Sequence, residues 1–357
     1  MKKSTTQTQR IVVGLDLGDR YSHFCILDPE GQVIEEGRIA TKKEALRRKF
    51  EGTEPMLVVF EVGTHSPWVD RLLQSLRHET IVANAGKVAL IYRNERKHDR
   101  KDAHSLAELG QFKPRLLHPI RHRSEETQAV RALVRSRDVL VKSRTAFINH
   151  CRGVVKASGN RLPRCSAESF ARKVATGIPE ELRGGLGPVL EFIEKLNLQI
   201  RAYDRKIEKI CEEQFPITEV LRQVSGVGPL TALWYVLTIE DPTRFERSRD
   251  VGPFLGLVPR LDQSGEQDPQ RRITKAGDEL MRRLLVGSAN YILGPFGPDC
   301  DLRQWGQRIA ARGGKNAKKR AAVAVARKLS VLLHHLWITG EVYEPFMRGT
   351  EKLEAAA

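Results

Sequence analysis

The sequence contains few cysteines and no long apolar run, and each shortage excludes a class of protein. Its five cysteines are scattered over 357 residues without metal-ligand spacing, so we expect reduced thiols. No run approaches the roughly 18 apolar residues that a membrane span needs. The polar start "MKKSTTQTQR" lacks the pattern of a signal peptide. These absences predict a folded cytoplasmic protein with no membrane partner.

Acidic residues are also in short supply. The chain has 60 Lys and Arg against 44 Asp and Glu, a formal net charge of +16, and the segment from Leu302 to Gly340 has no acid at all. A cationic surface of this size favours a polyanionic partner, with nucleic acid the leading candidate. Within that segment we expect phosphate contacts from Lys315, Lys318, Lys319 and Arg320. The charge alone does not identify a reaction, since ribosomal and chromatin proteins can carry a similar charge.

Residues 1–118 alternate between strand-like and helix-like segments. β-Branched and apolar runs predict strands at 11–18, 21–28, 32–39, 56–63 and 79–84, the first three forming a meander with a turn at "PEG". Helices are predicted at 41–52, with Thr41 as the cap, at 65–78 and from 99 onward. Three meander strands followed by βα units predict an α/β domain of the RNase H-like fold, with a mixed sheet.

Residues 119–216 are predicted to form a helical, coiled-coil region for oligomerisation. Apolar residues repeat in steps of four and three in its second half, at Val189, Ile193, Leu196, Ile200, Tyr203, Ile207 and Ile210. Its first half repeats Leu133, Leu140, Phe147 and Val154 at intervals of seven. Both a helical hairpin within one chain and a coiled coil between chains satisfy this pattern.

Residues 217–347 are predicted to form a mainly helical domain, and 348–357 a disordered tail. The stretch "VSGVGPLTALWYV" is typical of a helix-hairpin-helix, in which Gly226 and Gly228 make the tight turn and the next helix directs its amides at a DNA phosphate. A plain turn between two helices fits the same residues.

Four carboxylates lie at positions where they could act together in one metal site. Asp16 and Glu61 each end a predicted buried strand, so adjacent strands would bring both to one edge of the sheet. Asp99 and Asp102 are three apart at a helix start and share a face. Oxygen-rich sites suit Mg²⁺, which activates a nucleophile in phosphodiester cleavage. For Asp99 and Asp102, stabilisation of the helix start is an alternative role.

The polar stretch "VPRLDQSGEQDPQRRITKAGDELMRR", residues 258–283, carries one serine and several cations. Ser264 and Gly265 suit an ordinary turn. Arg271, Arg272 and Lys275 follow closely, where they could neutralise a phosphate in its transition state or form a solvated basic face. The residues alone leave both readings open.

Motifs at both ends of the chain carry a family resemblance. Near the start they are "VGLDLGDRYSHFCILDPEG", "FEVGTH" and "DRKDAHSLAEL"; near the end they are "VSGVGPLTALWYV", "FLGLVPRLDQSGEQ" and "RRITKAGDELMRRLLV". Together and in this order they resemble the RuvC-like DEDD domain and the serine transposase domain of the IS110 insertion-sequence transposases.

The resemblance implies a prokaryotic DNA recombinase that cuts and rejoins strands through a covalent phosphoserine intermediate. It implies Asp16, Glu61, Asp99 and Asp102 as the DEDD ligands of Mg²⁺ (or Mn²⁺), and Ser264 as the nucleophile. It also implies a homo-oligomer, a dimer or tetramer, that acts on element ends and target DNA chosen by an element-encoded bridge RNA.

Two other functions stay open, and a third ranks last. In a RuvC-type hydrolytic, structure-specific endonuclease, water would attack and Ser264 would only turn the chain. A nucleic-acid binder without catalysis would not need the four carboxylates. A sugar-kinase or actin-like ATPase needs a second phosphate loop and an adenosine loop, which the sequence lacks.

Overall fold

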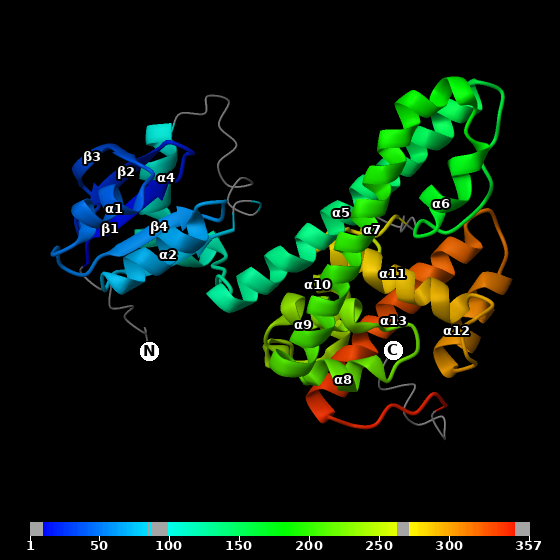
Figure 1. The fold of residues 1–357 in the computed structure, drawn as a ribbon. Helices are drawn as coiled ribbons and strands as arrows, with labels where there is room; N and C mark the ends of the chain where they lie inside the picture. Colours follow the sequence, from blue (N-terminus) through cyan, green and yellow to red (C-terminus); the bar gives the residue numbers. More distant parts are fainter. Residues whose placement is uncertain (1–9, 85, 87–98, 263–270, 347–357) are drawn as a thin grey trace. The chain divides into compact units, whose positions relative to one another are not determined.

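The computed structural model describes residues 10–84, 86, 99–262 and 271–346, although the side chain of Asp99 is outside this description. The chain divides into two compact units, 1–124 and 125–357 (Figure 1). The boundary expected after residue 118 lies near this division, and the one expected after 216 falls inside the second unit. We describe each unit by itself.

The first unit is built on one five-stranded mixed sheet with the order β3-β2-β1-β4-β5. Its strands are β1 Val12–Asp16, β2 Tyr21–Leu27, β3 Val33–Ala40, β4 Leu57–Glu61 and β5 Glu79–Ala83. β1 to β3 form the predicted antiparallel meander, and β4 and β5 add in parallel to β1. The sheet is compatible with an RNase H-like fold. β5, predicted as a strand at 79–84, lies at one edge of the sheet.

Helices cover both faces of this sheet. Helices α1 (Lys43–Phe50) and α2 (Ser66–Ser75) pack on one face, where Val13 and Leu15 of β1 are buried. Helix α4 (Asp99–Phe112) packs on the other face, over Val12 of β1. The predicted cap of α1 is wrong: Lys42 occupies the cap position, and the Thr41 hydroxyl donates to the carbonyl of Gly18.

Small residues let α4 lie unusually close to the sheet. A Cβ on Gly14 would come within 1.9 Å of the Ala103 carbonyl oxygen and 2.5 Å of the Ala107 nitrogen. A Cβ on Gly110 would meet Val59 at 2.4 Å. The backbones of strand and helix therefore meet directly, and any larger residue would force them apart.

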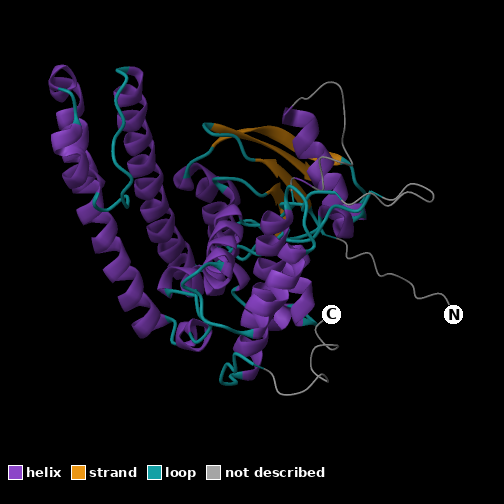
Figure 2. Cartoon of the chain, turned by 90° about the vertical axis from the view of Figure 1, so that its right-hand side faces the viewer, coloured by secondary structure: helices purple, strands orange, loops and turns teal. Residues whose placement is uncertain are grey.

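The second unit begins with a helical hairpin. Helices α5 (Glu125–Ala157) and α7 (Glu180–Gln214) run side by side, joined through the short α6 (Phe170–Val174), as Figures 1 and 2 show. Ile193, Leu196 and Ile200 of the predicted repeat are buried. Of the two alternatives left by the repeat, the structure shows the hairpin within one chain.

The remaining helices form the core of the second unit. They are α8 Ile217–Arg222, α9 Pro229–Ile239, α10 Val251–Phe254, α11 Glu279–Leu293, α12 Asp301–Ala311 and α13 Ala317–Thr339. Helix α9 is buried from Thr231 to Ile239, so it is the central helix of this core. Helix α13 is long and apolar enough to cross a membrane by length and composition, which the sequence reading did not anticipate. Its buried side chains, such as Val325 and Leu329, belong to this same core.

Candidate active site and nucleic-acid surfaces

Strand pairing brings Asp16 and Glu61 to one edge of the sheet. β1 and β4 are parallel neighbours whose register aligns Leu15 with Phe60, and each carboxylate is the next residue along its strand. Both lie on the face that α4 covers, because side chains alternate and Val12 and Val59 are buried beneath α4. Each is half-buried. The structure therefore places these two predicted residues as neighbours.

The direction of α4 brings its first turn toward the same edge. Ala103 and Ala107 lie against Gly14, while Gly110 lies against Val59 and Val12, so the helix runs opposite to β1. From Gly14 to Asp16 the strand advances about 6.6 Å. The same distance along α4, toward its N-terminal end, spans roughly four residues. That step reaches the turn that contains Asp102, whose side chain is half-buried.

We call the four predicted ligands, Asp16, Glu61, Asp99 and Asp102, the carboxylate site; carboxylates are a type of donor that suits a hard divalent cation. All of its donors are carboxylate oxygens, the ligands that Mg²⁺ and Mn²⁺ prefer. Among the residues that the structure describes, no three His, Cys, Asp or Glu side chains are grouped closely enough to hold a metal. The fourth member, Asp99, begins α4, but its side chain lies outside that description.

The predicted nucleophile, Ser264, lies outside the described residues, but the segments on either side of it are described. They pair through an isolated antiparallel β-bridge between Pro259 and Ile273: Arg260 donates its amide to the Arg272 carbonyl at 3.0 Å, and Thr274 to the Val258 carbonyl at 2.9 Å. Close backbone contact continues at Gly256, where a Cβ would meet the Ala276 nitrogen at 2.3 Å. The chain that leads into and out of 263–270 is therefore anchored on both sides.

A largely buried carboxylate that the sequence did not predict, Asp278, ties this paired segment to the core. Asp278 caps α11 by accepting from the Met281 amide at 2.9 Å, and also accepts from the indole of Trp234 at 2.9 Å. Arg131 of α5 reaches it at 3.1 Å and stacks over the Trp234 ring. Burial opposes ionisation of Asp278, but these hydrogen bonds and the nearby arginines outweigh it and lower its pKa.

The three cations that follow Ser264 in the sequence are exposed, and they differ in their partners. The Arg271 Nε lies 2.8 Å from the Asp262 carboxylate, so its charge is already partly balanced. Because Arg271 is already paired, Arg272 and Lys275 are the better candidates for phosphate contact.

The predicted helix-hairpin turn between α8 and α9 is present, with different roles for its two glycines. Gly226 adopts φ +87°, and a Cβ there would meet the Tyr291 ring at 2.9 Å. Gly228 is exposed, with open space around it, and occupies the cap position of α9. Gly226 thus makes the turn against α11, while Gly228 presents the start of α9 to solvent.

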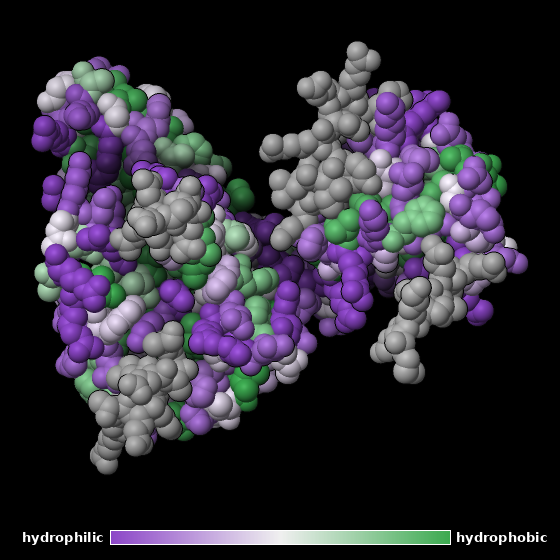
Figure 3. All heavy atoms as spheres, turned by 180° about the vertical axis from the view of Figure 1, so that it is seen from behind, coloured by the Kyte–Doolittle hydropathy of each residue, from purple (hydrophilic) through white to green (hydrophobic). Residues whose placement is uncertain are grey.

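The basic segment begins before α13 and continues into its first turn. Lys315 precedes the helix, whereas Lys318, Lys319 and Arg320 lie within its first four residues, and all four are exposed. Cations at a helix start oppose the macrodipole, and a bound anion would relieve that cost. The face shown in Figure 3 is mostly hydrophilic, with small separate hydrophobic patches.

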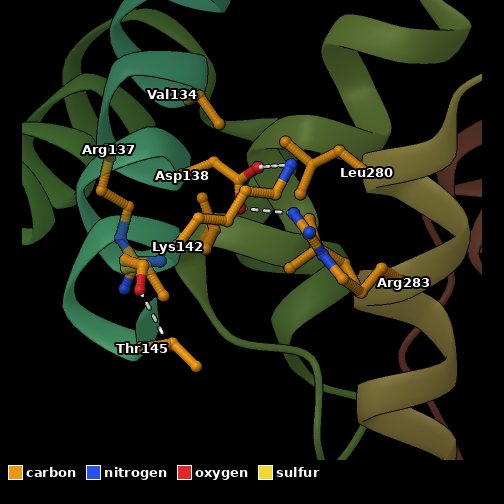
Figure 4. Close-up of a pocket in the computed structure, with 10 residues that line it drawn as sticks. Val134, Arg137, Asp138, Lys142, Thr145, Leu280 and Arg283 are labelled. Carbon is orange, nitrogen blue, oxygen red and sulfur yellow. Dashed lines mark hydrogen bonds and ion pairs between the residues drawn. The ribbon is translucent and has the colours of Figure 1, made fainter. Parts of the chain in front are cut away.

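A cavity of about 390 Å³ lies between α5, α9 and α11 (Figure 4). Its apolar lining includes Val134, Leu280 and Leu284, and Asp138 stands at its edge, paired with Arg283 and with Lys142 at 3.1 Å. Burial opposes ionisation of Asp138, but its two cationic partners outweigh this and lower its pKa. Because Asp138 is already neutralised by these two cations, we assign no chemistry to this cavity.

Comparison with known proteins gives two family matches. A transposase model of the DEDD type from IS110 elements matches residues 13–158, and a model described as "Transposase IS116/IS110/IS902 family" matches residues 218–295. The chain is 29% identical to the transposase for insertion sequence element IS1111A of Coxiella burnetii, over 93% of this chain and 91% of that protein. It is 28% identical to a probable family 20 transposase of Pseudomonas aeruginosa, over 93% and 98%.

The chain belongs to the IS110 family of transposases. Membership makes it an enzyme of DNA strand transfer, and the DEDD type indicates use of a divalent metal. The first match covers the sheet, α4 and α5, and the second runs from α8 through α11. Both the carboxylate site and the segment with Ser264 therefore lie inside the matched regions of the transposase.

Proposed function

We propose that this transposase cuts and rejoins DNA strands at the carboxylate site through a covalent bond to Ser264. The observation that supports the proposal is that Asp16 and Glu61 end neighbouring parallel strands on the face covered by α4, in a chain of the IS110 family. The anchored segment around Ser264 and the exposed Arg272 and Lys275 supply the rest of the proposed machinery.

The proposed chemistry conserves the number of phosphodiester bonds. The Ser264 oxygen forms a bond to the phosphorus and the bond to one sugar oxygen breaks, while the serine proton leaves and the departing oxygen takes one up. Attack by the hydroxyl of the second strand reverses these changes, so no ATP is consumed. Mg²⁺ held by the four carboxylates would lower the cost of deprotonating the serine and stabilise the leaving oxygen. Arg272 and Lys275 would neutralise charge on the phosphate.

We further propose that the partner nucleic acids are element ends, target DNA and an element-encoded bridge RNA, and that the enzyme acts as a homo-oligomer. The positive charge and the exposed cations at the start of α13 support contact with nucleic-acid backbones. RNA guidance would leave sequence choice to base pairing, so the protein would need few base contacts.

The rate of strand transfer by carboxylate variants tests the proposed roles of Asp16 and Glu61. The full chain is incubated with Mg²⁺, the junction DNA of its element and RNA transcribed from the element's non-coding flank. Asp16→Asn and Glu61→Gln should each lower the rate by more than about 10²-fold, since changes one shell further from a metal already cost about 10- to 100-fold. Asp28→Asn is the matched control, because the Asp28 carboxylate accepts the Gln32 amide in a turn at the other end of the sheet. Equal rates in all four proteins would refute the site.

The proposed covalent bond to Ser264 is tested by looking for a protein–DNA adduct on a denaturing gel. Wild type should form a protein–DNA adduct that Ser264→Ala lacks, while Ser166→Ala, a change in the hairpin loop, should leave it intact. Cleavage by both wild type and Ser264→Ala without any adduct would instead establish a hydrolytic RuvC-type endonuclease. Omitting the RNA should abolish transfer at the correct junction; transfer that proceeds unchanged would contradict RNA guidance.

A further inference from the structure

The row of side chains at the edge of the carboxylate site continues beyond Asp16 to β2 and β3. In the register of the sheet, Asp16 is opposite His23, and His23 is opposite Arg38. Directly opposed residues in antiparallel strands project from the same face. With strands about 4.8 Å apart, Arg38 therefore starts about 10 Å from Asp16, on the same face and at the same edge.

Arg38 is held by an aromatic ring. Its guanidinium carbon lies 4.4 Å from the centre of the Tyr21 ring, and Tyr21 is 50% exposed. Stacking of this kind restricts the long arginine side chain and leaves the edge of its planar fork open to a ligand. Both residues come from the strand end where Asp16 lies, so β2 and β3 present a preorganised cation beside the carboxylates.

Two neighbouring cations are paired with carboxylates, whereas Arg38 is exposed and no described carboxylate pairs with it. Arg100 of α4 lies 3.9 Å from Glu36, on the same face, and Lys49 lies 2.6 Å from Glu35, on the opposite face. Among the residues that the structure describes, Arg38 forms no ion pair; its recorded contact is Tyr21.

We propose that Arg38, stacked on Tyr21, binds a backbone phosphate of the DNA strand next to the phosphate that reacts at the carboxylate site. This inference rests on the proposed function. A strand that approaches several carboxylates meets their repulsion, and a cation about 10 Å to the side would offset it and fix the strand's direction. The guanidinium fork matches two phosphate oxygens, which a lysine cannot do. Arg38 is thus assigned as a substrate-positioning residue, and Tyr21 as its support.

Equilibrium binding of the full chain to junction DNA, measured over a range of salt concentrations, tests this without relying on turnover. Arg38→Ala should weaken binding roughly 5-fold and reduce the slope of log K against log salt by about 0.7 to 0.9, the value for one phosphate contact. Arg48→Ala is the matched control, because Arg48 is exposed on α1, across the sheet, and should leave the slope unchanged.

Two further variants separate charge from geometry. Arg38→Lys should keep the salt slope but lower the rate of strand transfer, because the fork and its stacking are lost. Tyr21→Phe should behave as wild type, whereas Tyr21→Leu should lower affinity toward that of Arg38→Ala. Wild-type affinity and slope in both Arg38→Ala and Arg38→Gln would overturn the inference.

Asp16→Asn distinguishes failure of this inference from failure of the proposed function. It should lower the rate of strand transfer by more than about 10²-fold and retain the wild-type salt slope. If Asp16→Asn transfers strands at the wild-type rate, the proposed carboxylate chemistry fails, while a reduced slope in Arg38→Ala would still locate the DNA at this edge.

Discussion

Replacing Gly14 by alanine should separate the two halves of the carboxylate site. Gly14 lies in extended β1, where alanine fits the backbone, so the effect is purely steric. The new Cβ would lie 1.9 Å from the Ala103 oxygen, although real Cβ atoms essentially never approach another atom closer than 3.0 Å. Helix α4 must therefore retreat from β1 by about 1 Å.

Two consequences follow from that displacement. Overpacking of this kind costs about 1–3 kcal/mol in the free energy of unfolding of the first unit. The retreat also carries Asp102, the neighbour of Ala103, away from Asp16. A misplacement of about 1 Å in a catalytic geometry can cost roughly 10²-fold in rate, so strand transfer should fall by about that factor.

Gly63→Ala supplies the matched control. Gly63 follows β4 near Glu61, and a Cβ there would have no atom within 4 Å. Urea unfolding monitors stability, and strand transfer at saturating DNA monitors rate. The reasoning is refuted if Gly14→Ala retains the stability and rate of wild type, or if Gly63→Ala loses as much of both.

Three further predictions concern the second unit. Asp278→Ala should lower the free energy of unfolding of the second unit by about 3 kcal/mol, because a largely buried ion pair loses one partner. Because folding lowers the pKa of Asp278, wild type should also lose this stabilisation as pH falls below about 4. Asp278→Asn should lack this pH dependence. Lys318→Ala combined with Lys319→Ala should reduce the salt slope of DNA binding by nearly 2, and an unchanged slope would exclude that helix start from the interface. Gly226→Ala should destabilise the unit by about 1–2 kcal/mol in thermal unfolding, because of its positive φ and the nearby Tyr291 ring, whereas the open Gly228→Ala should not.

Local pattern was enough to predict much of the first unit. The meander and the βα order follow from alternating apolar residues and turn residues, and a lone acid at the end of a buried strand placed Asp16 and Glu61 at one edge. Thr41 misled the prediction because its hydroxyl bonds to Gly18 and Ser22, which are distant in sequence. A cap preference is local, and such partners override it.

Contacts across long sequence separations could not be predicted. The sequence around Asp278 carries a capping signal, an acid before an apolar helix, but nothing in it indicates Trp234 or Arg131 as partners. The close approach of α4 depends likewise on Gly14 meeting Ala103, which no local pattern contains. The heptad repeat did not distinguish a hairpin from an intermolecular coiled coil, because both bury the same face.

The most direct test of the central claim, that the ends of β1 and β4 and the start of α4 form one metal site, is a Mn²⁺ titration followed by electron paramagnetic resonance. Wild type should bind Mn²⁺, and Asp16→Asn, Glu61→Gln and Asp102→Asn should each weaken binding by more than about 10-fold. Asp28→Asn should bind as wild type. Unchanged Mn²⁺ affinity in all three site variants would contradict the account.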